Sequence, residues 1–263
     1  MRISKMVWPI LGAILMAALH ANAAPEPEPK PEAKDLPSNV DAKPAIDPAK
    51  LAGSAALRAT DARNHKASSK NFQQIVLAAH NYASAENGAL PANVTDKAGK
   101  QLLSWRIRLL PYVGEKALYE KFKLGEPWDS KNNLALLEKM PKVFESPRVT
   151  VKIKGYTVYQ VFDGPGALYE SGKSKYHVSN IPDGTNSTIF AVESSKAVPW
   201  TKPTDLPYDK AKAVPDFGKA YGNKPLCAMV DGSVRTIDLK KVSPATLRNA
   251  ICPDDGNVLG ADW

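Results

Sequence analysis

The sequence predicts an α+β fold in which N-terminal helices pack on a mainly antiparallel β-sheet. Residues 72–83 have the apolar spacing of a helix, whereas the chain beyond Lys142 is divided into short segments rich in β-branched and aromatic residues. Asp231 and Gly232 stand between two alternating apolar runs, which is the strongest sequence signal for a β-hairpin. Residues 51–263 are long enough to form one such domain with its own core.

The first predicted helix has a single apolar face, formed by Phe72, Ile75, Val76, Ala79, Tyr82 and Ala83. The alanine-rich residues before this face are expected to continue the helix upstream. Asn87 and Gly88 tolerate the left-handed backbone that ends many helices, so we expect the helix to end there. His80 lies near the apolar edge, and we interpret it as a packed, hydrogen-bonded residue and not as a ligand.

Three short helices are predicted next, and five aromatic residues lie among them. The helices cover residues 105–110 with Ser104 as N-cap and Pro111 as stop, residues 115–123, and a third segment that begins at Asp129 or Ser130 and closes at Met140. The aromatic residues are Trp105, Tyr112, Tyr119, Phe122 and Trp128. They predict either a stacked apolar cluster or an exposed platform for a sugar or peptide.

Strands are predicted in the second half of the chain. The segments are residues 142–145, 156–162, 187–193 and the two hairpin arms within 226–239. A C-terminal helix follows, with Ser243 as N-cap, Pro244 in its first turn, and Leu247 and Ile251 facing inward.

Residues 1–23 have the pattern of a secretory signal peptide. Arg2 and Lys5 precede a short apolar run, and small residues at positions 21 and 23 form the cleavage pattern. The run is shorter than the ~20 residues that span a bilayer, which favours cleavage over retention as an anchor. We therefore predict an exported protein of the periplasm, the extracellular space or the cell envelope, with no stable membrane span after cleavage.

Residues 24–50 alternate proline with charge and contain almost no large apolar side chain. Such a segment cannot bury enough surface to offset the entropy of ordering the chain, so it predicts a disordered spacer. The formal net charge of +8 falls to +6 once Arg2 and Lys5 leave with the signal peptide. Five basic residues form a local run: Lys139, Lys142, Arg148, Lys152 and Lys154. An exported protein rarely meets nucleic acid, so we expect an envelope protein, a secreted protein or an anionic wall polymer as the partner and no nucleic acid.

The chain carries no motif that predicts catalysis, and we expect it not to be an enzyme. It has no Gly-x-Ser-x-Gly elbow, His-Glu-x-x-His pair, phosphate-binding glycine loop or Cys-x-x-Cys. Two turns rich in Asp, Asn and Gly make calcium the one candidate ligand, through Asp183, Asn186, Asp254 and Asp255. Such turns also form with no metal at all, because Asx side chains bond to their own backbone. No other cofactor is predicted.

Cys227 and Cys252 are the only cysteines. In an oxidising compartment a pair invites a disulfide, whereas buried free cysteines are also common, so both states remain open.

Several blocks of the chain occur together in one known family. They are "NFQQIVLAAHNY", the whole stretch from Leu102 to Pro147, "YQVFDGPGA", "IPDGTNSTIFAVESSKAVPWTKP" and "VDGSVRTI". In this order they closely resemble the planctomycete-type family catalogued as domain of unknown function 1559 (DUF1559). Its typical members resemble type II secretion pseudopilins: a prepilin site and a long hydrophobic helix precede a small α+β head. The resemblance therefore implies a pseudopilin-like head domain.

The chain departs from that family pattern in two ways. A signal peptide and a spacer replace the prepilin N-terminal helix, which puts filament assembly in doubt. Members also often carry two cysteines, implied to pair, where this chain has Ser68 and Ser146. Cys227 and Cys252 are then candidates for a replacement disulfide.

We expect an exported, non-enzymatic domain that binds a protein or envelope component. Trp105, Arg106 and Trp128 are the predicted binding face, since aromatic and Arg residues are common interface anchors. The alternatives are a pseudopilin-like subunit of a secretion or pilus system, and a hydrolase of envelope polymers.

Overall fold

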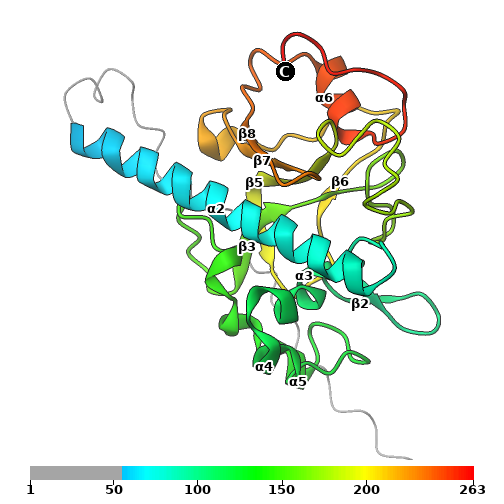
Figure 1. The fold of residues 1–263 in the computed structure, drawn as a ribbon. Helices are drawn as coiled ribbons and strands as arrows, with labels where there is room; N and C mark the ends of the chain where they lie inside the picture. Colours follow the sequence, from blue (N-terminus) through cyan, green and yellow to red (C-terminus); the bar gives the residue numbers. More distant parts are fainter. Residues whose placement is uncertain (1–54) are drawn as a thin grey trace, which may run out of the picture. The chain divides into compact units, whose positions relative to one another are not determined.

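The computed structural model describes residues 55–263 (Figure 1). The predicted signal peptide, residues 1–23, and the predicted spacer, residues 24–50, lie outside the described residues. So do the first four residues of the predicted domain.

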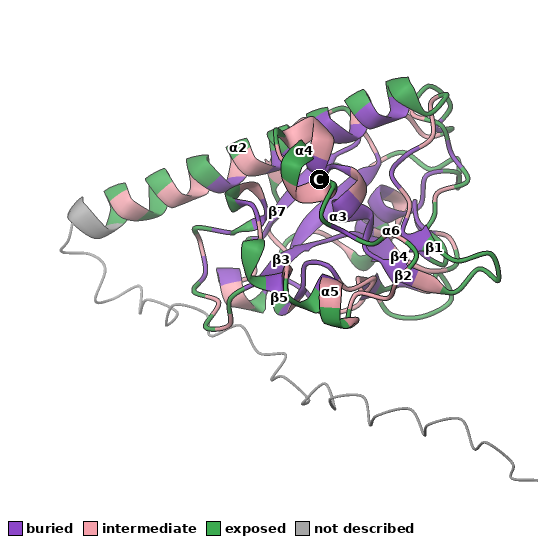
Figure 2. Cartoon of the chain, turned by 90° about the horizontal axis from the view of Figure 1, so that it is seen from below, coloured by how far each residue is buried: buried purple, intermediate pink, exposed green. Residues whose placement is uncertain are grey.

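The longest element is helix α2, Ala55–Ala85, which lies across one face of the β-sheet (Figure 1). Its buried positions begin at Ser68 and then recur at helical spacing, and Phe72 and Ile75 are fully buried. Figure 2 shows this alternation of buried and exposed residues along α2. Asn87 and Gly88 have φ angles of 53° and 88°, and the Gly88 amide donates to the Ala83 carbonyl at 2.7 Å. The predicted left-handed helix end is confirmed.

The main sheet has four antiparallel strands in the order β3-β5-β7-β8. The strands are β3 (Tyr156–Gln160), β5 (Ile189–Pro199), β7 (Leu226–Met229) and β8 (Val234–Thr236). The predicted hairpin is β7 and β8, and Gly232 in its turn has a φ of 87°. A long N-terminal helix on an antiparallel sheet confirms the predicted α+β class. Two small sheets lie outside it: antiparallel β1 (Val94–Thr95) with β2 (Gln101–Leu103), and parallel β4 (Phe162–Asp163) with β6 (Leu206–Pro207).

Short helices connect these layers. They are α3 (Trp105–Arg108), η1 (Leu110–Val113), α4 (Lys116–Tyr119), α5 (Lys131–Leu134), η2 (Leu137–Lys139), η3 (Lys142–Phe144), η4 (Lys219–Tyr221) and α6 (Pro244–Ile251). The hydroxyls of Ser104, Ser130 and Ser243 each accept a backbone N–H in the first turn of α3, α5 and α6. Three predicted N-caps are thus confirmed, with Ser130 and not Asp129 at α5. Pro111 does not end helical structure as predicted, because it occupies the first turn of η1, where no amide hydrogen is needed.

The strand predicted over residues 142–145 is wrong, because the chain forms the 3-10 helix η3 there. The amide of Phe144 bonds to the carbonyl of Pro141 and folds the chain into a turn. The fully buried Phe144 ring then stacks on Trp200 with 5.8 Å between ring centroids. Four residues cannot distinguish a strand from a tight helix by period, and packing against a distant tryptophan decided this one.

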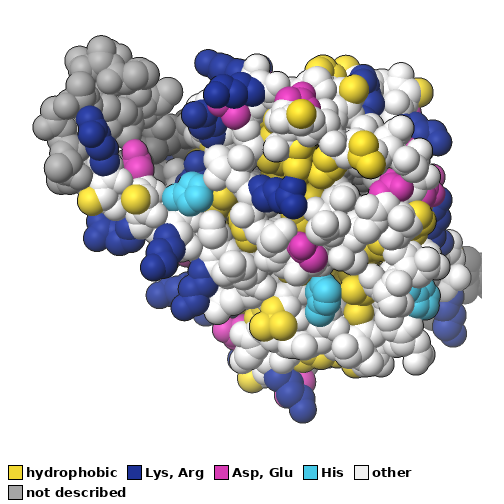
Figure 3. Space-filling view, turned by 45° about the horizontal axis from the view of Figure 1, so that its top comes forward, with side chains coloured by type: hydrophobic (Ala, Val, Ile, Leu, Met, Phe, Trp, Pro, Cys, Tyr) yellow, Lys and Arg dark blue, Asp and Glu magenta, His cyan; other side chains and the backbone are white. Residues whose placement is uncertain are grey.

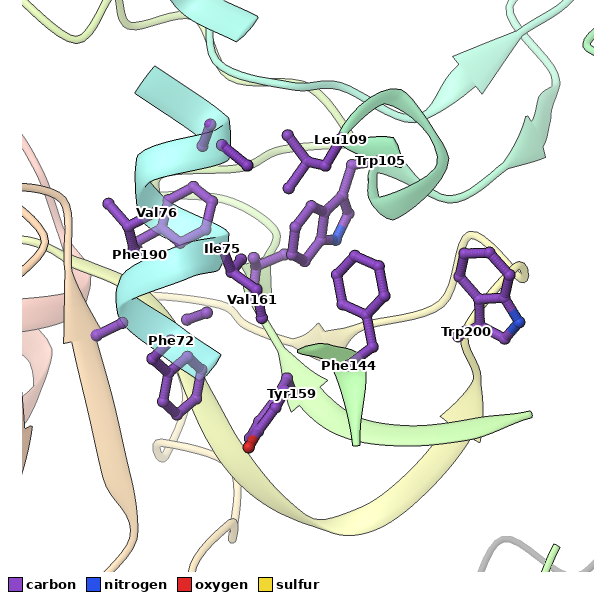
Figure 4. Packing of buried hydrophobic residues seen from close by; sticks show 14 of the residues in the cluster. Phe72, Ile75, Val76, Trp105, Leu109, Phe144, Tyr159, Val161, Phe190 and Trp200 are labelled. Carbon is purple, nitrogen blue, oxygen red and sulfur yellow. The ribbon is translucent and has the colours of Figure 1, made fainter. Parts of the chain in front are cut away.

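The sheet separates two apolar clusters, because alternate residues of a strand face opposite sides. On β7, Leu226 and Ala228 belong to the cluster under α2, whereas Cys227 and Met229 belong to the cluster that includes α6. Figure 4 shows the first cluster, in which α2 brings the Phe72 ring within 4.4 Å of the Tyr159 ring, centroid to centroid.

The five aromatic residues of the Trp105–Trp128 segment do not stack on one another. Trp105 packs edge-on against Phe190, Phe122 against Trp200, and Tyr112 against Tyr82. The segment therefore joins the core through residues in distant parts of the chain. Its own sequence gives no information about these partners.

Candidate binding site

A pocket of about 420 Å³ lies between the η2–η3 segment and the start of β3. Four apolar residues line part of it and form what we call its wall: Met140, Val149, Val151 and Ile153. Polar side chains converge on the same space from Ser146, Tyr156, Glu138, Glu145 and Lys154. Apolar residues beside convergent polar groups, in a pocket of this volume, can hold a small ligand.

Tyr156 brings a hydroxyl without a hydrogen-bond partner to this pocket. The residue is 5% exposed and lines the pocket, yet within residues 55–263 its hydroxyl bonds to no side chain or backbone group. Burial raises the pKa of Tyr156 above its ordinary value of 10.0, so the hydroxyl stays protonated and is able to donate. Tyr156 is not among the described residues that hold a fully buried polar atom without a partner, so its hydroxyl reaches the solvent of the pocket and is accessible to a ligand.

The rim of the pocket carries charge of both signs. Glu138, Glu145 and Lys154 are all exposed, and none of them forms an ion pair in the described part of the chain. On the face drawn in Figure 3, Lys and Arg side chains lie at several separate places among few Asp and Glu. The rim charges are therefore open to a ligand that brings opposite charges of its own.

Beneath the pocket, Ser146 belongs to a buried network centred on Glu193 of β5. The Glu193 carboxylate accepts from Ser146 Oγ at 3.3 Å, from Ser68 Oγ of α2 at 2.6 Å and from the Leu226 amide at 2.9 Å. The Arg148 guanidinium pairs with the same carboxylate. The network thus ties α2, the loop after η3 and two strands to one buried charge.

Burial raises the pKa of the Glu193 carboxyl, and the Arg148 guanidinium and the hydroxyl of Ser68 oppose that rise. Burial and the nearby Glu193 also raise the pKa of the Tyr159 hydroxyl, which lies 2.7 Å from Ser68 Oγ. A phenol held protonated and a carboxylate held by donors on several elements make a structural network. The network fixes the position of Ser146 in the pocket lining, and these two groups supply no activated nucleophile.

Two residues of the predicted binding face do not lie on a surface. Trp105 is 1% exposed and Arg106 is 0% exposed. Arg106 Nη2 lies 2.7 Å from the buried Asp205 carboxylate, and Trp105 Nε1 donates to the same carboxylate at 3.2 Å. Only Trp128 is half-buried, with Lys202 Nζ 5.3 Å from its ring centroid. This part of the prediction is corrected: a Trp-Arg pair suited to an interface is here part of the core.

The four calcium candidates do not gather into one cluster of side chains. The two Asp-rich turns do meet, since the Asp183 carboxylate accepts the backbone amides of Asp255 and Gly256 at 2.8 and 3.0 Å. Asp254 instead bonds to Lys175 and Tyr176, and Asn186 Oδ1 accepts from the neighbouring Ser187 hydroxyl. Within residues 55–263, no three His, Cys, Asp or Glu side chains gather as metal ligands. The carboxylates close turns by hydrogen bonding.

Cys227 and Cys252 are not joined in this structure, although both are buried in the cluster that includes α6. Cys252 Sγ lies 3.5 Å from the Tyr208 hydroxyl. The predicted replacement disulfide is therefore absent here. Burial raises the pKa of both thiols and keeps them protonated, so neither is a ready nucleophile.

The resemblance pointed to one pair of positions that the fold does bring together. Ser68 and Ser146 are 78 positions apart, yet both hydroxyls bond to the same oxygen of Glu193. The sequence reasoning missed Glu193 itself. Its available signal was a single acidic residue inside the apolar run "IFAVESS", where a charge needs a buried partner.

We expect a double variant, Ser68→Cys with Ser146→Cys, to form a disulfide under mild oxidation, because both side chains reach one atom. Closing a loop of about 80 residues raises the free energy of unfolding by about 4 kcal/mol. The loss of each serine hydroxyl hydrogen bond lowers it by about 1 kcal/mol. Non-reducing electrophoresis and urea unfolding measure the bond and its effect. Each single variant is the control, and a folded double variant that keeps both thiols reduced would show that the two side chains lie too far apart for a disulfide.

The described chain is an α+β domain in which a long helix covers an antiparallel sheet and a small amphipathic pocket opens beside the edge strand β3. Residues 61–178 match the family model SBP_bac_10, described as "Protein of unknown function (DUF1559)", which confirms the likeness to DUF1559 over that segment. The match contains most of α2 and the whole pocket and ends before β5. No curated protein and no solved structure matches the chain. Among the helices of residues 55–263, none combines the length and apolarity needed to cross a membrane.

Proposed function

We propose that this protein is an exported, non-enzymatic domain that binds a component of the cell envelope in the pocket around Tyr156. The observation that carries the proposal is Tyr156, a buried residue in the pocket lining whose hydroxyl is accessible and has no partner in the described chain. A bound molecule would supply that partner. The signal-peptide pattern of residues 1–23 supports export.

The chemistry of the pocket supports binding over turnover. Its lining contains neither His nor Cys, and its carboxylates, Glu138 and Glu145, are both exposed at the rim. A general acid–base pair usually needs a buried or specifically perturbed group near the reacting atom. Here the buried acid, Glu193, is not part of the pocket lining and accepts hydrogen bonds from several elements.

The test is capture of envelope components by the full chain and by a variant with a filled pocket. Val151→Trp places a large side chain at a half-buried position of the wall and is expected to abolish the capture of those components that wild-type protein enriches. Ser174→Trp is the matched control, because Ser174 is half-buried in a second pocket of about 280 Å³. Equal capture by all three proteins would exclude this pocket as the binding site. N-terminal sequencing of the recovered protein tests signal cleavage after residue 23.

A second candidate function is a pseudopilin-like subunit of a secretion or pilus system. It is favoured by the 31-residue α2, whose first described turns, residues 58–67, contain no fully buried side chain. In such a subunit these turns would pack against neighbouring subunits. Co-purification of secretion components, or oligomers that dissociate when Arg63 and Lys66 are replaced by Glu, would support this candidate. A monomer that enriches no such component would exclude it.

A further inference from the structure

We propose that the pocket around Tyr156 takes a zwitterionic apolar amino acid, free or as a short peptide. This inference rests on the proposed binding function and names the ligand class for the same site. It follows from three features of one pocket: its apolar wall, its two kinds of rim charge and its unpartnered hydroxyl.

The wall accounts for the apolar part of the ligand. Val149 is buried, and Met140, Val151 and Ile153 are half-buried along the same lining. An aliphatic or aromatic side chain of a ligand that packs on these four residues would replace water there. The driving force is the removal of apolar surface from water on both partners.

The rim accounts for the charged part of the ligand. Glu138 and Glu145 offer two carboxylates to an ammonium group, and Lys154 offers an ammonium to a carboxylate. These three side chains form no ion pair in the described chain. A ligand with both charges can pair with the carboxylates and with Lys154. A ligand with one charge leaves either the carboxylates or Lys154 without a partner.

Tyr156 accounts for the remaining polarity. Its hydroxyl is protonated and unpartnered at the wall, so it is available to donate to the carboxylate or the first carbonyl of the ligand. Ser146, also in the lining, is already committed to Glu193. Tyr156 is therefore the hydrogen-bonding side chain of the wall that is left for the ligand.

An anionic polymer is the less suitable occupant. Of the basic run in this region, only Lys154 lines the pocket. Arg148 is paired with Glu193, and Lys152 has a partner of its own. With two carboxylates against one ammonium, the lining repels a polyanion more than it attracts one.

Calorimetry with the full chain tests the ligand class. The probes are L-leucine, L-leucyl-L-leucine, N-acetyl-L-leucine and L-leucinamide, which retain both charges or remove one. We expect leucine or the dipeptide to bind, and each cap to weaken binding at least tenfold, the cost of one lost charge-assisted hydrogen bond. Preference between leucine and the dipeptide distinguishes a free amino acid from a peptide.

Two variants test the residue roles. Tyr156→Phe keeps the ring and is expected to weaken binding about tenfold with an unchanged melting temperature. Lys154→Met is expected to weaken binding of leucine but not of leucinamide, and Lys173→Met, at the second pocket, is the control. If no probe binds while Val151→Trp still abolishes envelope capture, the ligand class is wrong and the binding site stands. If Val151→Trp also leaves capture unchanged, both proposals fail.

Discussion

Replacing Arg106 by Met is expected to lower the free energy of unfolding by about 3–5 kcal/mol, because the change leaves a buried carboxylate without its partner. The side chains of Arg106 and Asp205 are 0% and 2% exposed, and Arg106 also donates to the Tyr159 carbonyl and to Ser104 Oγ. Burial already raises the pKa of the Asp205 carboxyl, and Arg106 is the main group that opposes this rise. Loss of the guanidinium removes that opposition.

Urea unfolding followed by tryptophan fluorescence measures this effect. The control is Lys212→Met, whose partner Asp209 lies on the surface and whose own side chain is 78% exposed, so the midpoint should hardly move. The double variant Arg106→Met with Asp205→Leu should recover part of the loss, because it leaves no buried charge unpaired. An Arg106→Met protein as stable as the control would show that this pair is not buried as described.

Glu193→Leu is expected to cost a similar amount, about 3–5 kcal/mol, for the converse reason. It removes the acceptor shared by Ser68 Oγ, the Leu226 amide and the Arg148 guanidinium, all of which then lie near an apolar side chain. Glu193→Gln should cost less, since one amide oxygen still accepts hydrogen bonds.

The same unfolding assay ranks these variants, with wild type most stable, Gln intermediate and Leu least. Glu138→Gln, at the exposed pocket rim, is the control and should behave as wild type. If the Leu variant were as stable as the Gln variant, the donors around Glu193 would have other partners and the network would be wrong. A Leu variant that folds but has lost the pocket would show that the network positions Ser146.

Local signals predicted the elements whose causes lie within a few residues. The hairpin turn at Gly232, the caps at Ser104 and Ser243 and the end of α2 at Gly88 each follow from backbone geometry or one side-chain hydrogen bond. Periodicity likewise identified the buried face of α2, because one helix face and one apolar core impose the same spacing.

The candidate site was less accessible to sequence reasoning. Tyr156 was part of a predicted strand, but nothing in "YTVYQVF" distinguishes a tyrosine whose hydroxyl is bonded from one whose hydroxyl is not. Trp105 and Arg106 were interpreted as an interface because their chemistry suits one. Their burial instead depends on Asp205, which is 99 positions away from Arg106. The Asp205 carboxylate is the buried charge to which both side chains bond.

What the sequence determined by itself was the α+β class, the α2 face, the hairpin and the helix caps, together with the likeness to DUF1559. These depend on short-range geometry and on period, which are properties of neighbouring residues. Only the tertiary structure decided that residues 142–144 form a helix, that Arg106 is buried, that Ser68 meets Ser146 and that Tyr156 lines a pocket. Each of these depends on contacts between distant segments. A polar or charged side chain that the sequence alone would place at a surface becomes a structural residue once it is buried and paired.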